Sequence, residues 1–259
     1  MTRAARKVVV VAALGGAAWW LASCRDIPAP EGGVVAISNI TLPSPGLVVN
    51  DTMRDSNGVA VPLQVTAFGV DGEPITPPTT PMFIVLDTGA HLVGPLLIGD
   101  DAGTTVRVVG SVGSLQTQLV SVKVTESPDT LVAADSTLHH KTYQLESAAD
   151  SVANSADLSV LVQHRGATTS GVEAVIVHYA IDKKPAGSGE GETAVLVNGS
   201  RLSARDTTDA TGKASRTARL RLGALTAFGA DTVVVSATSS YRGSTIGTVQ
   251  FTIIYTQQP

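Results

Sequence analysis

The chain has one cysteine, few aromatic residues and few charges. Aromatic residues make up 4% and charged residues 15% of its 259 positions. A single cysteine cannot close a disulfide within the chain, so apolar cores alone must hold its folded parts together. The aromatic content is low for a sugar-binding or interface-rich protein. A net charge of −4 gives no indication of nucleic-acid binding.

Several sequence signatures of catalysis are also missing. No G-x-S-x-G motif occurs, so a serine-hydrolase elbow has no support. The glycine-rich segment 187–192 is not followed by Lys-Ser or Lys-Thr, and its own Glu190 and Glu192 would repel phosphate. We interpret this segment as a mobile loop. The expectation is a protein that is not an enzyme and needs no cofactor.

The N-terminus has the pattern of an export signal. Arg3, Arg6 and Lys7 precede an uncharged apolar stretch from Val8 to Ser23. These sixteen residues fall short of the roughly 20 that cross a bilayer without strain, although an uncleaved membrane helix stays an alternative. The signal is expected to be a helix over residues 1–23.

The end of this stretch carries a more specific motif. Leu21, Ala22, Ser23 and Cys24 follow one another. They resemble the lipobox of bacterial lipoproteins, which implies lipidation of Cys24, cleavage before it and attachment of the mature chain to a membrane. Arg25 stands where an Asp would signal retention in the inner membrane of that family, so the resemblance favours the outer membrane. Residues 24–33 are rich in Pro and Gly and are interpreted as a tether.

Beyond the tether, short apolar runs alternate with turn signals. In the first region, 34–126, the runs are 34–40, 47–50, 63–68, 82–86, 104–112 and 115–124, with a hairpin predicted around Gly113 and Ser114. We interpret 127–155 as a linker and an irregular first part of the second domain. In 156–259 the runs are 158–163, 174–181, 194–197, 214–222, 232–238 and 247–255. Arg219 and Arg221 alternate with apolar residues, and they are expected to protect an edge strand from aggregation.

Many short strands at this spacing predict an all-β protein with two β-sandwiches in series. The segment 64–75 (QVTAFGVDGEPI) resembles a strand and turn of bacterial Ig-like repeats. The segments 208–214 (TDATGKA) and 231–238 (DTVVVSAT) resemble the invasin and intimin type of Ig-like domain. These resemblances imply two Ig-like domains in the two regions.

Three sets of residues are candidates for chemistry. Asp87 lies in the segment IVLDTGA, Ile84 to Ala90, which resembles the motif of retroviral-type aspartic proteases, where two Asp share a proton. The candidate downstream segment, 97–99, follows too closely for that family, so a strand ending in a turn is the preferred interpretation. No pair of histidines has zinc-like spacing, and solvated side chains are expected for His91, His139, His140, His164 and His178. Turn formation is preferred over calcium binding for Asp206, Asp209 and Asp231.

The leading functional hypothesis is a lipid-anchored protein of the cell envelope whose Ig-like domains serve binding, adhesion or spacing. Its partners would be the membrane, through the lipid, and an unknown protein or carbohydrate. An accessory or scaffold subunit of a periplasmic or outer-membrane assembly stays an alternative. A hydrolase that uses Asp87 is a minor one. Fold alone does not decide among them.

Overall fold

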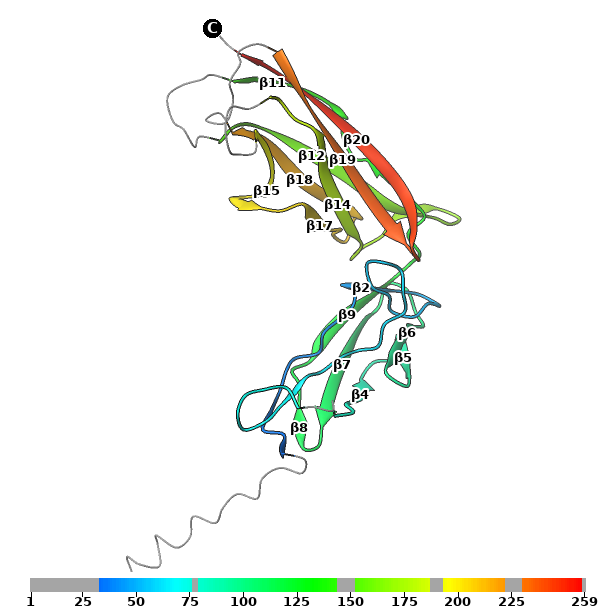
Figure 1. Cartoon of the computed structure of the whole chain (residues 1–259). Helices are drawn as coiled ribbons and strands as arrows, with labels where there is room; N and C mark the ends of the chain where they lie inside the picture. Colours follow the sequence, from blue (N-terminus) through cyan, green and yellow to red (C-terminus); the bar gives the residue numbers. More distant parts are fainter. Residues whose placement is uncertain (1–32, 76–78, 144–151, 187–192, 222–229, 258–259) are drawn as a thin grey trace, which may run out of the picture.

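The computed structural model describes residues 33–75, 79–143, 152–186, 193–221 and 230–257. These residues form strands and turns with no α-helix among them, and they build two domains, as predicted (Figure 1). Among them, none belongs to a helix with the length and apolar character of a membrane span. The predicted signal, the lipobox and the glycine-rich segment 187–192 lie outside the described residues.

The first domain is organised around one larger sheet. Its strand order is β2 (Gly46–Val48), β9 (Val120–Thr125), β7 (Thr105–Val112) and β4 (Met82–Val85), with β8 (Leu115–Gln116) beside β7. The short pairs β1 (Ala36–Ile37) with β3 (Ala67–Phe68), and β5 (Ala90–Val93) with β6 (Leu96–Gly99), complete it. Buried side chains from both parts form its core, which includes Leu47, Met53, Leu97, Val106, Val108, Val122 and Val124.

The predicted hairpin in 104–125 is confirmed. β7 and β9 are antiparallel, and Thr105 lies opposite Lys123. Side chains of β7 alternate between exposed and buried along its first half, because successive residues of a strand face opposite sides of the sheet. Gly113 has a φ of 59°, which suits the turn between β7 and β8.

The second domain is a sandwich of two sheets whose strands are mostly antiparallel. One has the order β10 (Thr130–Ala133), β12 (Val152–Arg165), β18 (Lys213–Arg221), β15 (Ala194–Asn198) and β16 (Arg201–Leu202), with β13 (Thr169–Gly171) beside β12. The other has the order β11 (Leu138–Tyr143), β20 (Ser244–Gln257), β19 (Ala230–Tyr241), β14 (Ile176–Lys183) and β17 (Arg205–Thr207). Their inner faces bury a core that includes Leu158, Val160, Val177, Leu220, Val235, Phe251 and Ile253.

This strand order is that of an immunoglobulin-like domain. When β10, β12, β14, β15, β18, β19 and β20 are lettered A to G, one sheet runs A-B-E-D and the other contains G-F-C. The larger sheet of the first domain repeats part of this order, because β2, β9, β7 and β4 occupy the places of β11, β20, β19 and β14. Both domains therefore have an Ig-like arrangement.

Two expectations need correction. Residues 127–155 are not irregular throughout, because β10 and β11 lie in this segment and pair with β12 and β20. Arg219 and Arg221 do not protect an edge, because β18 lies between β12 and β15 in the middle of its sheet. Their alternation with apolar residues reflects the outer face of a central strand, where long cationic side chains reach solvent.

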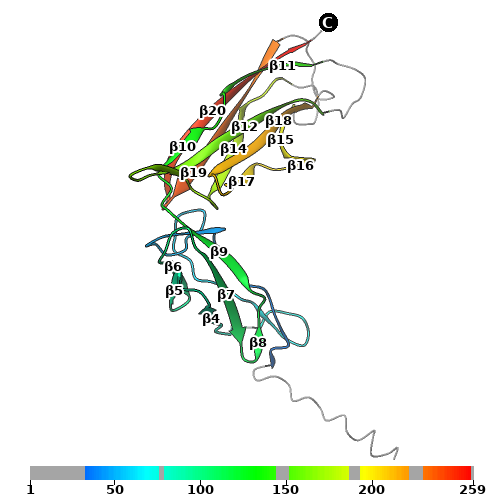
Figure 2. The same cartoon turned by 180° about the vertical axis from the view of Figure 1, so that it is seen from behind.

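The two domains follow one another end to end. Figures 1 and 2 show the strands of the first domain at one end of the molecule and the far end of β20 at the other, with the junction between them. The connection is short, because β9 ends at Thr125 and β10 begins at Thr130. The turn after β2 and the tip of the β19–β20 hairpin meet at this junction.

Candidate functional site: the junction between the two domains

The backbone at the junction adopts costly conformations. The non-glycine residues with positive φ among the described residues are Asn50 (54°), Ala174 (62°) and Arg242 (51°). All three border the junction: Asn50 precedes Asp51, and Ala174 and Arg242 line the pocket described below. A left-handed conformation costs an L-residue about 1–2 kcal/mol. Such conformations persist where the surrounding contacts determine them, and they often mark functional positions.

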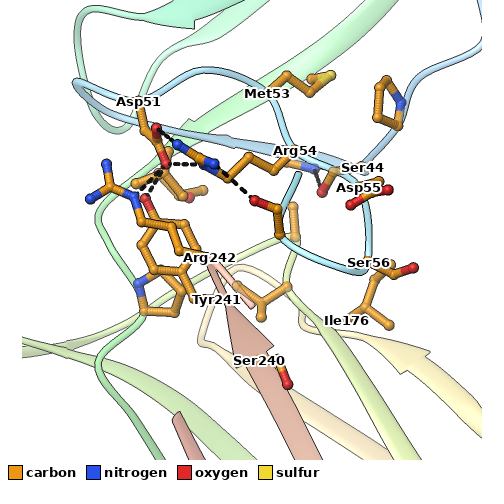
Figure 3. Close-up of a pocket in the computed structure, with 18 of the residues that line it drawn as sticks. Ser44, Asp51, Met53, Arg54, Asp55, Ser56, Ile176, Ser240, Tyr241 and Arg242 are labelled. Atoms are coloured by element: carbon orange, nitrogen blue, oxygen red, sulfur yellow. Dashed lines mark hydrogen bonds and ion pairs between the residues drawn. The ribbon is translucent and has the colours of Figure 1, made fainter. Parts of the chain in front are cut away.

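One carboxylate, that of Asp51, joins the two domains. Its side chain is only 5% exposed. From its own domain it accepts hydrogen bonds from Nε of Arg54 (2.9 Å) and from the backbone N–H of Thr52 (2.8 Å). From the second domain the hydroxyl of Tyr241 (2.6 Å) and Nε of Arg242 (2.9 Å) donate to it. We call the four side chains of Asp51, Arg54, Tyr241 and Arg242 the Asp51 network (Figure 3).

The local fold explains how each domain presents its part. Tyr241 lies opposite Ser244, so Arg242 and Gly243 form the two-residue turn of the β19–β20 hairpin. Both have positive φ, 51° and 76°, as a type I′ turn requires. Arg242 is an unusual residue in such a turn, and its bond to Asp51 offsets part of the cost. Figure 3 shows Tyr241 and Arg242 extending from this tip towards Asp51 and Arg54.

The network holds Asp51 in its charged form. Burial alone would raise the pKa of Asp51, but hydrogen bonds from Arg54, Arg242 and Tyr241 outweigh it and hold that pKa far below its usual range. Burial, and then the bond to Asp51, raise the pKa of Tyr241 to about 12, so the phenol remains a donor at neutral pH. Two cations and one phenol therefore converge on one buried anion.

The depressed pKa of Asp51 predicts that acid weakens the junction. In the unfolded chain an Asp titrates near pH 3.9. A carboxyl whose folded pKa lies lower stabilises the fold fully above that pH, and the contribution is lost as pH falls towards the folded pKa. We expect the distance between labels on the two domains to become more variable below about pH 4. In Asp51→Asn this pH dependence should be absent; an identical acid response in both proteins would refute the assignment to Asp51.

Close backbone contacts reinforce the network. A Cβ placed on Gly58 would lie 2.0 Å from the backbone nitrogen of Gly243, so this loop of the first domain rests directly on the hairpin tip of the second. A Cβ on Gly46 would lie 2.9 Å from Cβ of Ala174. These contacts come from two different segments of the first domain. They restrict the movement of one domain over the other.

Lys123 adds an ion pair across the junction. Its Nζ lies 3.7 Å from Oε2 of Glu173 in the second domain. Both side chains are partly exposed, so this pair contributes little compared with the buried carboxylate.

A pocket of about 110 Å³ lies between the domains beside the network. The first domain lines it with residues that include Ser44 and Asp55, and the second with residues that include Ile176, His178 and Ser240. Asp55 accepts hydrogen bonds from the N–H groups of its own turn, those of Asn57 and Val59. Burial, and then Arg205, lower the pKa of His178, so its imidazole is neutral at pH 7. The arrangement binds two domains together and shows no nucleophile paired with a base among the described lining residues.

Asp87 is held by an arginine rather than poised for hydrolysis. Nη2 of Arg107 lies 2.9 Å from its Oδ1, and the backbone N–H and Nε of Arg107 donate to Oδ2. These bonds lower the pKa of Asp87. The residue follows β4 and precedes β5, in agreement with a strand that ends in a turn, and the segment 97–99 lies in β6. Both carboxylate oxygens are thus engaged within the domain.

The histidines are dispersed among local partners. Nδ1 of His91 lies 2.8 Å from Asp100, and Nδ1 of His164 lies 2.8 Å from Asp129. His139 packs near the ring of Phe251, while His140 is exposed on the other side of β11. No group of three His, Cys, Asp or Glu side chains suited to a metal ion occurs in the part of the chain that the structure describes.

The aspartates considered for calcium bind neighbouring protein groups. Asp209 accepts hydrogen bonds from the N–H groups of Thr211 and Lys213 and so shapes its turn. Asp206 pairs with the buried guanidinium of Arg216 at 3.0 Å. Asp231 accepts a hydrogen bond from the N–H of Thr232. Each has its own local role.

Comparisons with known proteins concern the fold. No family model matches the chain, and no curated protein matches it. Among solved structures, the chain is similar to domains 1–6 of the surface layer protein SbsC (14% identity, TM-score 0.31), covering 88% of this chain and 28% of that one. It is also similar to the Yersinia pseudotuberculosis adhesin InvE (14% identity, TM-score 0.36), covering 86% of this chain and 60% of that one.

A human example is similar too. Domains EC1-2 of human mucin-like protocadherin match with 11% identity and a TM-score of 0.29, covering 86% of this chain and 98% of that one. The chain thus spans under a third of the surface layer structure and about three fifths of the adhesin structure. At these levels of similarity the matches assign no activity or partner. The chain has an all-β fold of two Ig-like domains in series, resembling modules of surface-layer and adhesion proteins.

Proposed function

We propose that this protein is a lipid-anchored, non-enzymatic protein of the cell envelope whose two Ig-like domains form a spacer of fixed shape. The spacer would hold a binding surface for a protein or carbohydrate partner at a set distance from the membrane. The observation that carries the proposal is the buried carboxylate of Asp51, which bonds to side chains of both domains. A flexible pair of domains would have no need of a charge buried at the junction, because burying one is costly unless it is fully bonded.

The fixed shape is supported by contacts at separate points. The Asp51 network fastens the turn after β2 to the β19–β20 tip, Gly58 rests on Gly243, and Gly46 meets Ala174. A single contact would leave rotation about it free, whereas several separated contacts oppose both bending and twisting. The short connection from Thr125 to Thr130 limits the freedom further.

The anchor is supported by the residues of the N-terminus. Cations, an apolar stretch and the motif from Leu21 to Cys24 stand in the order that lipoprotein processing requires. Stable attachment needs more than one acyl chain, since each buried methylene contributes only about 0.8 kcal/mol. A diacylglycerol on Cys24 with an acylated amine would meet that need, and residues 25–33 would separate the first domain from the bilayer.

The proposed anchor predicts the result of fatty-acid labelling. In cells fed a labelled fatty acid, the wild-type protein should carry the label, while Cys24→Ala should lose it and stay uncleaved, because no thiol is left to acylate. The matched control is Ser23→Ala, which keeps a small residue before the cysteine and should retain the label. Labelling of Cys24→Ala at the wild-type level would remove the anchor from the proposal.

Protease digestion of intact and permeabilised cells then locates the domains. Digestion in intact cells would place them outside the cell, where a surface or adhesive role applies. Digestion only after permeabilisation would place them in the periplasm and support the scaffold role within an envelope assembly.

A further inference from the structure

Each domain pairs an N-terminal strand with its last strand in parallel. β2 runs parallel to β9 through three residue pairs, from Gly46 opposite Lys123 to Val48 opposite Thr125. β11 runs parallel to β20 through six pairs, from Leu138 opposite Thr252 to Tyr143 opposite Gln257. The other pairings between the described strands are antiparallel. The same feature therefore recurs at corresponding places of both domains.

Parallel pairing determines how a pull between the two ends of a domain is carried. The incoming chain reaches β11 at Leu138, and the outgoing chain leaves β20 at Gln257, at the opposite end of the paired region. Tension then pulls the two strands past each other along their length, and all rungs of the ladder bear the load together. In an antiparallel hairpin pulled by its two ends, the rungs would open one after another. A parallel terminal pair is the arrangement that resists separation.

The strand that carries the load is fastened into the core. Phe251, Ile253 and Tyr255 of β20 are buried with the core cluster of the second domain. Tyr143 at the end of β11 is buried in the same cluster. On its other edge β20 pairs with β19 over twelve residue pairs. A force that slides β20 along its neighbours must therefore break its packing in the core and its pairing with β19, as well as its parallel pairing with β11.

The junction lies on the same line of force. The first domain ends with β9, whose parallel partner β2 leads directly into the turn that holds Asp51. Asp51 in turn holds the β19–β20 tip, next to the start of β20. The two parallel pairs are thus linked through the Asp51 network as well as through the chain. Figure 1 shows β20 and β9 both running to this junction, where the two domains meet at an angle.

We propose that the chain is a load-bearing element, in which the β11–β20 pair is the main clamp and the β2–β9 pair a weaker one. The proposal rests on the proposed function, because an anchored spacer is the setting in which tension between the ends of the chain arises. The load-bearing role also implies that the two domains differ in mechanical strength. Six residue pairs join β11 to β20 in the second domain, whereas three join β2 to β9 in the first. The first domain would then extend first and spare the second.

Single-molecule stretching of the full chain tests this inference. In a Cys24→Ala background, with handles at both ends, we expect two unfolding steps, of about 30 nm for the first domain and about 40 nm for the second, at up to 3.6 Å per residue. The shorter step should come at the lower force. In a second protein, Ser200→Cys moves the C-terminal handle to the exposed turn between β15 and β16, so that β20 carries no direct load and the tension no longer shears β11 against β20. The force that opens the second domain should then fall by roughly half or more, because its rungs no longer break together.

Two results would overturn the inference: an equal opening force for the second domain in both geometries, or opening of the second domain before the first. The outcome is separable from that of the proposed function, because stretching is done on the purified chain without lipid. If Cys24 is labelled by lipid but the second domain opens at the same force in both pulling geometries, the anchor stands and only the load-bearing role is removed.

Discussion

Asp51→Asn should lower the free energy of unfolding by about 2–4 kcal/mol. The amide has the shape of the carboxylate but not its charge, so Arg54 and Arg242 lose their common anion. Its NH₂ group would also face donors, because Arg54, Tyr241 and Arg242 all donate to Oδ2 of Asp51. Urea unfolding followed by circular dichroism at pH 7 measures the change.

Asp87→Asn is the matched control for this variant. Asp87 also accepts hydrogen bonds from an arginine, Arg107, but the pair lies within the first domain and is partly exposed. Solvent screens such a pair, so its loss should have little effect on stability. Equal shifts of the urea midpoint in the two variants would show that Asp51 has no special role at the junction.

Gly58→Ala should separate the two domains at the hairpin tip. Its φ of 80° is unfavourable for alanine, and the added Cβ would meet the backbone of Arg242 and Gly243. Backbone cannot move aside as a flexible side chain can. We expect a loss of about 2–5 kcal/mol, of which about 1–2 kcal/mol comes from φ and the rest from the overlap. Thermal or urea unfolding gives the loss, and labels on the two domains report the separation.

Gly94→Ala separates these two causes. Gly94 also has positive φ, 60°, but a Cβ there would have no atom within 4 Å. This variant should show only the cost of the backbone conformation, with the domains still fixed. If Gly94→Ala and Gly58→Ala were equally destabilised and equally rigid, the contact between Gly58 and Gly243 would have no energetic importance.

The sequence pattern was sufficient for strands with one buried and one exposed face. Short apolar runs between turn signals predicted β7, β9, β14, β18, β19 and β20 and two β-sandwiches, and the resemblance of segments 208–214 and 231–238 to invasin-type domains implied the Ig-like arrangement. The pattern failed for β10 and β11. In β11 the residues LHHKTY hold only two apolar side chains at its ends and the strand is an edge strand, so most of its side chains need not be apolar. A period-two signal cannot mark a strand whose faces are both polar.

The same limit explains the wrong interpretation of Arg219 and Arg221. An alternating strand shows which face is exposed, but not whether neighbours pair on one edge or on both. β18 is a central strand because β12 pairs with one of its edges and β15 with the other. These two strands come from separate parts of the sequence. Pairing partners follow from topology rather than from local composition.

The junction could not be found from local patterns. The motif Tyr241-Arg242-Gly243 between two alternating runs does indicate a hairpin turn, and Asp51 lies in a loop between runs. Nothing in either segment links them, since Asp51 and Tyr241 are 190 positions apart. The one available signal was a non-glycine residue at a turn that favours positive φ, which marks Arg242 as a position held by something else.

The most direct test of the account is the distribution of distances between one label on each domain. Val93 and Leu202 suit this purpose, because they are 55% and 73% exposed in the first and second domains. With cysteines at these two positions in a Cys24→Ala background, pulsed electron spin resonance should give one narrow distribution at pH 7. In Asp51→Asn it should broaden. A broad distribution in the protein with Asp51 intact would contradict the central claim that the two domains form a spacer of fixed shape.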